Sequence, residues 1–434
     1  MNLLPPDHPE RYRLADEVHA RPPEALETPS RATHVAVLVA QEQRSAEQAH
    51  LVALCEHFGV PAPTPLATHF SADLGSVRLK WERHGEFSGY TLFAAGRSPT
   101  PFSEPPLSML PARWLGGVPG TTIFAAHAKL IPFGDDLPSA DFLAAHFEAH
   151  VPAGAEIGGG AGLAFTDFRI RADGCARFLV LDRSFTPRQA GRTLQRLFDI
   201  ETYRMMALLA LPMAREQSAR IVGIERSLAS LTEGIARGNG NDESLLQALT
   251  GLAAEVERSL AASQFRFGAC RAYNDLVTTR ISELRERRLP GIQTIEEFML
   301  RRFAPAVATC ASTSQRLHDL SERVAQACAL LSTRVDIARE RQNQMLLESM
   351  NRRAKLQLRL QQTVEGLSVA AIVYYVAGLI GYLAKGLKAS GARVEPDLVV
   401  GIAIPLVAGL AVFVLRRARR KNFRAEGAAS EREL

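Results

Sequence analysis

The chain has 434 residues, which is too long for one ordinary domain and enough for two or three. Hydrophobic residues make up 47% and charged residues 22%, a composition that excludes a disordered or collagen-like protein. The 51 basic and 46 acidic residues give a net charge of +5, too near balance to indicate nucleic acid as a partner. The five cysteines are scattered without a CxxC pair. We therefore expect a reducing compartment, without a disulfide framework or a structural zinc site.

Residues 1–30 are interpreted as an N-terminal arm and residues 31–185 as a cytoplasmic α+β domain. The N-terminus has no basic segment followed by an apolar one, so we expect no cleaved secretion signal. In the domain the order strand, helix, strand, strand occurs twice, which predicts two similar βαββ halves. The expected elements are 34–40, 45–58, 77–84, 87–94, 122–130, 139–147, 163–171 and 176–182.

Residues 186–363 have a helical pattern and are predicted to form a long antiparallel helical or coiled-coil stalk. Thr186 is followed by a proline, as is typical of a helix start. Pro212 is expected to kink or break this first helix. A second long helix is predicted to continue through Arg287, and Thr294 begins a capping-box pattern for a shorter one.

The last helix of the stalk shows a seven-residue repeat. The apolar positions that repeat are Leu317, Val324, Leu331, Ala338 and Met345. The companion positions are poorer, namely Ser321, Cys328, Val335, Gln342 and Ser349. This spacing is typical of coiled coils, but the poor companions favour a helix packed against the other two helices. We expect it to continue directly into a membrane.

Two segments near the C-terminus, 366–383 and 398–415, carry no charged residue. Each has about 18 residues, the lower end of what spans the hydrocarbon core of a bilayer. Both are apolar all round, whereas a soluble helix of this length normally has a polar side. We predict transmembrane helices over 364–386 and 398–415, joined by a short external loop over 387–397.

Basic residues flank these segments unequally. The cytoplasmic flanks are expected to be Arg352, Arg353, Lys355 and Arg359 before the first span, and Arg416, Arg417, Arg419, Arg420, Lys421 and Arg424 after the second. The connecting loop holds only Lys385, Lys388 and Arg393, together with two acidic residues. The heavier clusters predict that both termini face the cytoplasm, including a basic tail over 416–434. The lipid bilayer is the predicted partner of this region.

Five candidate functional residues lie in or beside the first span: Glu365, Ser368, Tyr375, Gly378 and Tyr382. Tyr382 suits an interfacial anchor, and the small residue Gly378 allows close approach of another helix. Glu365 lies at the cytoplasmic edge of the span. There it either rings the mouth of a pore in an oligomer or faces water as an ordinary surface carboxylate.

One candidate metal site lies in the α+β domain. Glu82, His84 and Glu86 alternate along the chain and would share one face of a continuous strand, with ligand types suited to a divalent cation. The alternative is an exposed charged hairpin tip, because Gly85 interrupts the strand. No other cofactor is expected. The motifs GxSxG, HExxH and the Walker loop are absent from the sequence, so we expect no enzyme.

Five segments resemble a bacterial family of predicted membrane-anchored proteins, the domain of unknown function 3422. They are His8-Pro9-Glu10-Arg11-Tyr12 with Glu17-Val18-His19-Ala20-Arg21-Pro22, Lys80-Trp81-Glu82-Arg83-His84-Gly85-Glu86-Phe87, Phe198-Asp199-Ile200-Glu201-Thr202-Tyr203-Arg204, and Val373-Tyr374-Tyr375-Val376-Ala377-Gly378-Leu379. The resemblance covers nearly the whole chain. It implies a protein of the bacterial inner membrane and brings no assigned activity or catalytic residue.

The expected architecture also resembles, more loosely, the CorA-type magnesium transporters. These are pentamers with a cytoplasmic α/β domain and a long helix that becomes the first of two C-terminal spans. Their Gly-Met-Asn signature is missing, and Gly378-Leu379-Ile380-Gly381-Tyr382 stands near its place. Because topology alone is an analogy, it supports oligomerisation more than magnesium transport.

Two functions follow as hypotheses. The first is a non-enzymatic, membrane-anchored homo-oligomer whose stalk and α+β domain interact with partners or sense a cytoplasmic ligand. The second is a CorA-like cation channel whose first spans line the pore, with Glu365 near its entrance.

Overall fold

The computed structural model describes residues 5–12, 14–15, 22–238, 241–391 and 395–430, with side chains omitted at 415, 416 and 418–430. Residues 17–21 of the motif quoted above and Arg393 of the predicted loop therefore lie outside the described residues. The chain divides into two compact units, Met1–Leu331 and Ser332–Leu434, and each is described by itself.

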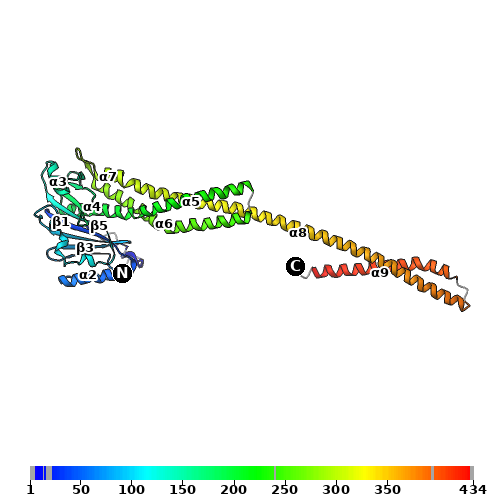
Figure 1. Cartoon of the computed structure of the whole chain (residues 1–434). Helices are drawn as coiled ribbons and strands as arrows, with labels where there is room; N and C mark the ends of the chain where they lie inside the picture. Colours follow the sequence, from blue (N-terminus) through cyan, green and yellow to red (C-terminus); the bar gives the residue numbers. More distant parts are fainter. Residues whose placement is uncertain (1–4, 13, 16–21, 239–240, 392–394, 431–434) are drawn as a thin grey trace. The chain divides into compact units, whose positions relative to one another are not determined.

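The N-terminal unit is built on one mixed sheet (Figure 1), whose strand order in the described residues is β2-β3-β4-β1-β5-β8-β7-β6-β9. The strands are β1 (Ser30–Leu38), β2 (His69–Asp73), β3 (Arg78–Arg83), β4 (Phe87–Ala95), β5 (Thr121–Pro132), β6 (Ala153–Ile157), β7 (Gly162–Thr166), β8 (Ala176–Asp182) and β9 (Arg287–Arg288). Strands β1 and β5 pair antiparallel at the centre, whereas β5 and β8 pair parallel. The α+β class is confirmed.

Each half of the domain has one strand more than predicted. With α2 (Arg44–Phe58) and α3 (Ala140–Phe147), the order is βαβββ twice, not βαββ. The additional strands are β2 and β6. Strand β6 reads Ala-Gly-Ala-Glu-Ile and so lacks the β-branched and aromatic residues typical of strands. Both predicted hairpins, β3–β4 and β7–β8, are confirmed by their antiparallel pairing.

Helices cover both faces of the sheet. Helix α4 (Pro187–Leu208) packs on the face that carries small side chains such as Ala32, Ala36 and Ala126. The opposite face is covered in two parts. Helix α2 buries Leu51 and Leu54 against β3 and β4, and α3 buries Phe147 against β7 and β8. Burying each such leucine or phenylalanine stabilises the fold by about 1.5–3 kcal/mol.

Helix α4 begins and ends as its sequence dictates. Thr186 forms the predicted cap, reinforced by a capping box with Gln189. The helix ends at Leu208, four residues before Pro212, because the proline ring clashes with the carbonyl at that distance and cannot donate to it. Helix α5 (Ala210–Arg237) follows immediately.

Helix α6 (Asp242–Leu284) is shorter than predicted. It ends at Leu284 because Arg285 adopts a left-handed conformation with φ of 53°. The prediction that it runs through Arg287 is wrong, since Arg287 and Arg288 form β9 and pair with β6. The predicted capping box at Thr294 is confirmed and begins α7 (Ile295–Arg302).

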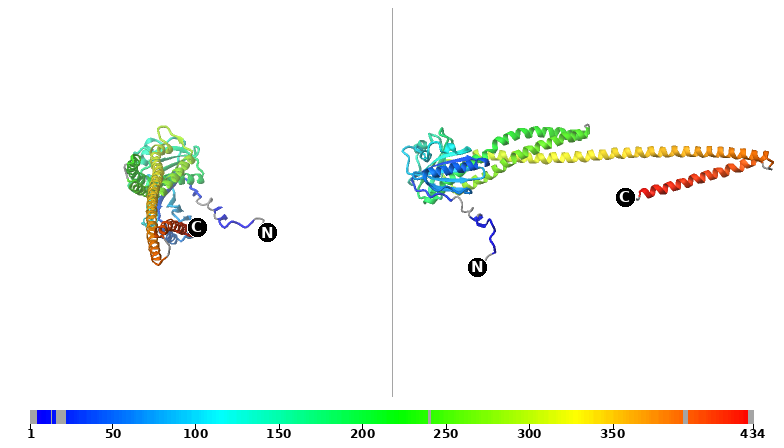
Figure 2. Two further views of the ribbon diagram at one scale, coloured as in Figure 1. Left: turned by 90° about the vertical axis from the view of Figure 1, so that its right-hand side faces the viewer. Right: turned by 90° about the horizontal axis from the view of Figure 1, so that it is seen from below.

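Helices α5 and α6 run alongside the first part of α8 (Ala304–Ala389) within the N-terminal unit (Figure 2), and the three share one hydrophobic cluster. As predicted, Leu317, Val324 and Leu331 are buried there. Their companions are Leu320 and Ala327, each four residues before the next repeat position. The predicted companions Ser321 and Cys328 lie one residue after these buried side chains, whereas the predicted companion Val335 is itself buried. The predicted repeat positions Ala338 and Met345 are exposed.

Candidate functional site

The C-terminal unit is a helical hairpin formed by the rest of α8 and α9 (Pro396–Ser430). Both helices are long and apolar enough to cross a membrane. Only 11% of the most apolar window in α8 and 6% of that in α9 is buried inside the chain. Most of these apolar side chains are therefore left uncovered by the described residues of the chain, and exposed apolar surfaces of this size are typical of interaction sites.

Small residues hold the hairpin together. Ala377 and Ala384 of α8 are buried, and a Cβ added to Gly381 would lie 3.0 Å from Cγ2 of Val400 on α9. These three positions follow the i, i+4, i+7 pattern of one helix face. Gly378 does not contact α9, because a Cβ there would meet nothing of this chain within 4 Å, and its predicted role in close approach of another helix stays a prediction. Within the hairpin, Gly381 has that role.

Helix α8 also carries a polar stripe, which we define as Gln361, Glu365, Ser368, Tyr375 and Tyr382. Ser368, Tyr375 and Tyr382 are seven residues apart, so they recur on the same helix face. At 3.6 residues per turn, Tyr375 lies about 200° around the helix from Ala377. Near its tyrosines, the stripe thus faces away from α9. Four of the five predicted residues of the first span belong to it, and Gly378 does not.

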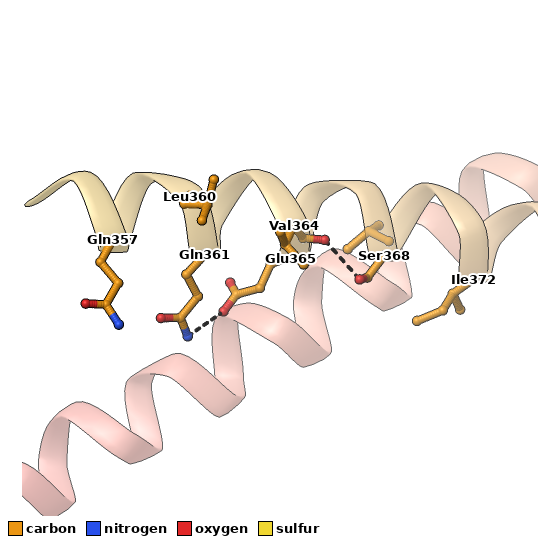
Figure 3. A pocket seen from close by; sticks show the side chains of 8 residues that line it. Gln357, Leu360, Gln361, Val364, Glu365, Ser368 and Ile372 are labelled. Atoms are coloured by element: carbon orange, nitrogen blue, oxygen red, sulfur yellow. Dashed lines mark hydrogen bonds between the residues drawn. The ribbon is translucent and has the colours of Figure 1, made fainter. Parts of the chain in front are cut away.

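The end of the stripe at Gln361 and Glu365 borders a shallow groove (Figure 3), whose polar lining residues are Gln357, Gln361, Glu365 and Ser368. Gln361 Nε2 donates a hydrogen bond of 3.4 Å to Glu365 Oε1. Ser368 Oγ donates one of 2.9 Å to the Val364 carbonyl. Both of these hydrogen bonds are local to α8.

The tyrosine hydroxyls of the stripe have no such local partner. Tyr375 is 71% exposed and Tyr382 78% exposed. Among the described residues, neither hydroxyl has a hydrogen bond. Tyr375 lies near the middle of the uncharged segment 366–383, far from either end. Its hydroxyl is therefore the polar group of the stripe that most requires a partner.

The predicted metal ligands Glu82, His84 and Glu86 have separate contacts. Glu82 Oε1 lies 3.0 Å from Lys80 Nζ. Glu86 forms an ion pair with Arg266 of α6 and accepts a hydrogen bond of 3.0 Å from Tyr273 Oη. His84 stacks on Phe87, with the ring centroids 4.3 Å apart.

The structure does not bring these three predicted ligands together. Strand β3 ends at Arg83 and β4 begins at Phe87, so His84 and Glu86 lie in the turn and lose the shared face of a strand. Within the described residues, the three metal-ligand side chains whose donor atoms lie within 4.8 Å of one another are instead His127, Asp173 and Cys175.

This cluster was missed because its members come from different elements. His127 lies on β5, and Asp173 and Cys175 flank the glycine of the turn before β8. The only local signal was Asp-Gly-Cys, which reads as a turn. Burial lowers the pKa of His127 to about 4 and raises that of Cys175 to about 11. Burial also opposes ionisation of Asp173, but the hydrogen bonds from Arg177 and from the Cys175 backbone, together with the charge of Arg177, outweigh it and lower the carboxyl pKa.

Comparisons with known proteins identify a family without a known activity. No curated protein matches the chain. The solved structure of the full-length CmaX protein matches with 13% identity over 68% of this chain and 89% of that chain. Its TM-score of 0.19 is too low to support a shared fold. The family model described as "Protein of unknown function (DUF3422)" matches residues 6–422, and the chain therefore belongs to the DUF3422 family.

Proposed function

We propose that this protein is a non-enzymatic homo-oligomer, anchored in a lipid bilayer by the α8–α9 hairpin, in which the polar stripes of neighbouring copies face one another. The carrying observation is the stripe itself, whose tyrosines lie on the side of α8 away from α9. An exposed hydroxyl in hydrocarbon costs several kcal/mol on transfer scales that exclude hydrogen bonding. A second copy supplies the missing partner, because the same hydroxyl recurs on the same face.

The part of α8 that precedes the hairpin supports association. From residue 336 to 364 the described side chains are all exposed. The large apolar ones among them are Ile337, Met345, Leu346, Leu347, Met350, Leu356, Leu358, Leu360 and Val364, each 49–69% exposed. In proteins, most of the stability of a helix comes from packing of its apolar side chains. Packing against the same segment of another copy would bury these side chains and stabilise the helix.

The proposed orientation places both termini in the cytoplasm of a bacterium, with the hairpin tip outside. Arg352, Arg353 and Lys355 are exposed on α8 before the apolar window. At the tip, Lys388 Nζ lies 3.6 Å from Glu395 Oε1, which offsets part of the positive charge there. The basic tail after the second span completes the asymmetry that retains a segment on the cytoplasmic side.

A cation pore is the second candidate. The groove with Gln357, Gln361, Glu365 and Ser368 favours it, because polar side chains of this kind line a wet axis when copies are arranged in a ring. That the protein conducts cations as CorA-type transporters do stays a prediction. Cation flux into liposomes separates the candidates. A pore predicts flux that Glu365→Lys lowers, whereas a closed scaffold predicts no flux in either protein.

The homo-oligomer is tested by removing the hydroxyls of Tyr375 and Tyr382 from every copy. We expect a defined oligomer by light scattering in mild detergent. The double variant Tyr375→Phe/Tyr382→Phe is expected to weaken association about tenfold, because hydrogen bonds between membrane helices contribute on the order of 1 kcal/mol each. Tyr374→Phe is the matched control, since Tyr374 is 76% exposed at the same depth but lies outside the stripe. A monomer at all concentrations, or equal weakening by the control, contradicts the proposal.

A further inference from the structure

Three side chains with different ligand chemistry meet on the sheet face opposite α4. His127 of β5 is paired with Arg177 of β8 in the parallel register, so His127 and Cys175 project from the same face. Asp173 adds a carboxylate from the turn. The potential ligand atoms of the three lie within 4.8 Å of one another. His127 and Cys175 are buried, whereas Asp173 is exposed and opens the cluster to solvent.

Neighbouring groups orient two of these side chains. His127 Nδ1 is 2.9 Å from Thr33 Oγ1 on β1, and His127 Nε2 is 3.7 Å from Asp173 Oδ2. With its Nδ1 hydrogen donated to Thr33, the ring presents the Nε2 lone pair to the cluster, as second-shell partners of metal-bound histidines do. The Cys175 backbone N–H donates a hydrogen bond of 3.1 Å to Asp173 Oδ1 and fixes the carboxylate.

Arg177 balances the carboxylate in the absence of a metal. Its Nη2 lies 2.5 Å from Asp173 Oδ2. The guanidinium also donates a hydrogen bond of 3.2 Å to the Cys175 carbonyl, and its central carbon lies 5.3 Å from the centroid of the Phe102 ring. These additional contacts keep the guanidinium in place when Asp173 Oδ2 binds a metal ion in its stead. Its charge lowers the affinity for that cation without blocking the site.

We propose that His127 Nε2, the Asp173 carboxylate and Cys175 Sγ bind one Zn²⁺ ion. Nitrogen, carboxylate oxygen and thiolate together suit Zn²⁺, whereas Mg²⁺ and Ca²⁺ prefer oxygen alone. Three protein ligands leave a fourth tetrahedral position, which a water molecule fills from the open side at Asp173. Zn²⁺ replaces the proton of the Cys175 thiol, so binding one ion releases one proton. The neutral histidine and the ionised aspartate give up none.

The test titrates the detergent-purified, metal-free full chain with Co²⁺, which reports a thiolate ligand by a charge-transfer band, and then displaces it with Zn²⁺. We expect one Co²⁺ per chain with this band, and its loss in Cys175→Ser. Cys55→Ser is the matched control, because Cys55 is also buried and belongs to the same hydrophobic cluster as Cys175. The control is expected to bind as the wild type does.

Asp173→Asn keeps the proposal testable if the serine variant fails to fold, because Asp173 is exposed and an amide oxygen still accepts the Cys175 N–H. We expect it to weaken Zn²⁺ binding about tenfold or more, within the range found when supporting groups of metal sites are changed, with an unchanged circular dichroism spectrum. Absence of the charge-transfer band in the wild type, or the same band in Cys175→Ser, overturns the assignment. Equal affinity of Asp173→Asn and the wild type does so as well.

Discussion

His34 lies between the sheet and α4 with both ring nitrogens hydrogen-bonded. Nδ1 is 2.9 Å from Thr91 Oγ1 and Nε2 is 3.3 Å from Thr202 Oγ1. The ring stacks on Phe198, with centroids 5.0 Å apart. Hydroxyl partners satisfy a neutral imidazole, which needs one acceptor and one donor. Burial accordingly lowers the pKa of His34 to about 3.

This shift predicts an acid-sensitive N-terminal unit. The unfolded chain takes up a proton on His34 near pH 6.5, whereas the folded protein takes it up only near pH 3. The contribution of buried, neutral His34 to the free energy of unfolding is therefore fully present above about pH 6.5 and is lost as the pH falls to about 3. The slope is about 1.4 kcal/mol of unfolding free energy per pH unit. Asp199, whose pKa burial raises to about 7, acts in the opposite direction.

The variant His34→Gln isolates the pH-dependent contribution of His34 to the free energy of unfolding. We expect the difference in unfolding free energy between the wild type and the variant to shrink by about 1.4 kcal/mol per pH unit from about pH 6 to 4. Urea unfolding followed by tryptophan fluorescence measures it, because both tryptophans, Trp81 and Trp114, lie in the N-terminal unit. His57→Gln, at an exposed histidine of α2, is expected to leave the slope unchanged. A constant difference for His34→Gln contradicts the assignment.

Residues whose roles depend on near neighbours were predictable from the sequence. The caps at Thr186 and Thr294 each contact a residue three positions later, so the pattern is complete within one turn. His127 and Cys175 meet only because β5 and β8 pair in the sheet. No local pattern contains that pairing, and the scattered cysteines argued only against a structural zinc site.

At the scale of elements, periodicity located the helices better than the short strands. Strand β6 carries Gly154, where an added Cβ would lie 2.3 Å from Cδ1 of Phe165 on β7. Phe165 thus leaves room only for a glycine at position 154. Because glycine is uncommon inside strands, it makes the strand harder to predict from the sequence. In the same way, the seven-residue repeat of α8 predicted its buried side, whereas the companion seam depended on how α5 and α6 pack against it.

The hairpin predicts a contrast between two glycines. Gly381→Leu forces a side chain against Val400 of α9 and is expected to cost about 1–3 kcal/mol, as overpacking does. Gly401→Leu adds the same side chain to α9 beside Val400, where a Cβ would meet nothing within 4 Å. Heating in detergent followed by gel filtration is expected to give a midpoint several degrees lower for Gly381→Leu only. Equal midpoints for the two variants argue against the small-residue interface.

At the scale of the molecule, one helix serves both units. Leu317, Val324 and Leu331 of α8 are buried in the core of the N-terminal unit, and the same helix continues into the C-terminal unit. The sequence predicted this continuity because no proline occurs between residue 306 and the apolar segment. The sequence did not show at which residue α8 stops packing against other helices of the chain. The exposed part of the helix also contains leucines, such as Leu346 and Leu360, and so looks like the buried part.

Two truncations separate the contributions of the C-terminal unit. A chain ending at Leu331 retains the buried residues of α8 in the first unit, so we expect it to fold and to remain in the supernatant as a monomer. A chain ending at residue 363 adds the exposed helix without the apolar windows. If that helix drives association, this chain is oligomeric in the supernatant; if the polar stripe drives it, only the full chain associates, and it does so in the membrane fraction. Ultracentrifugation without detergent and light scattering distinguish these results. An oligomer already formed by the shortest chain would place the association in the first unit and contradict the role proposed for the stripe.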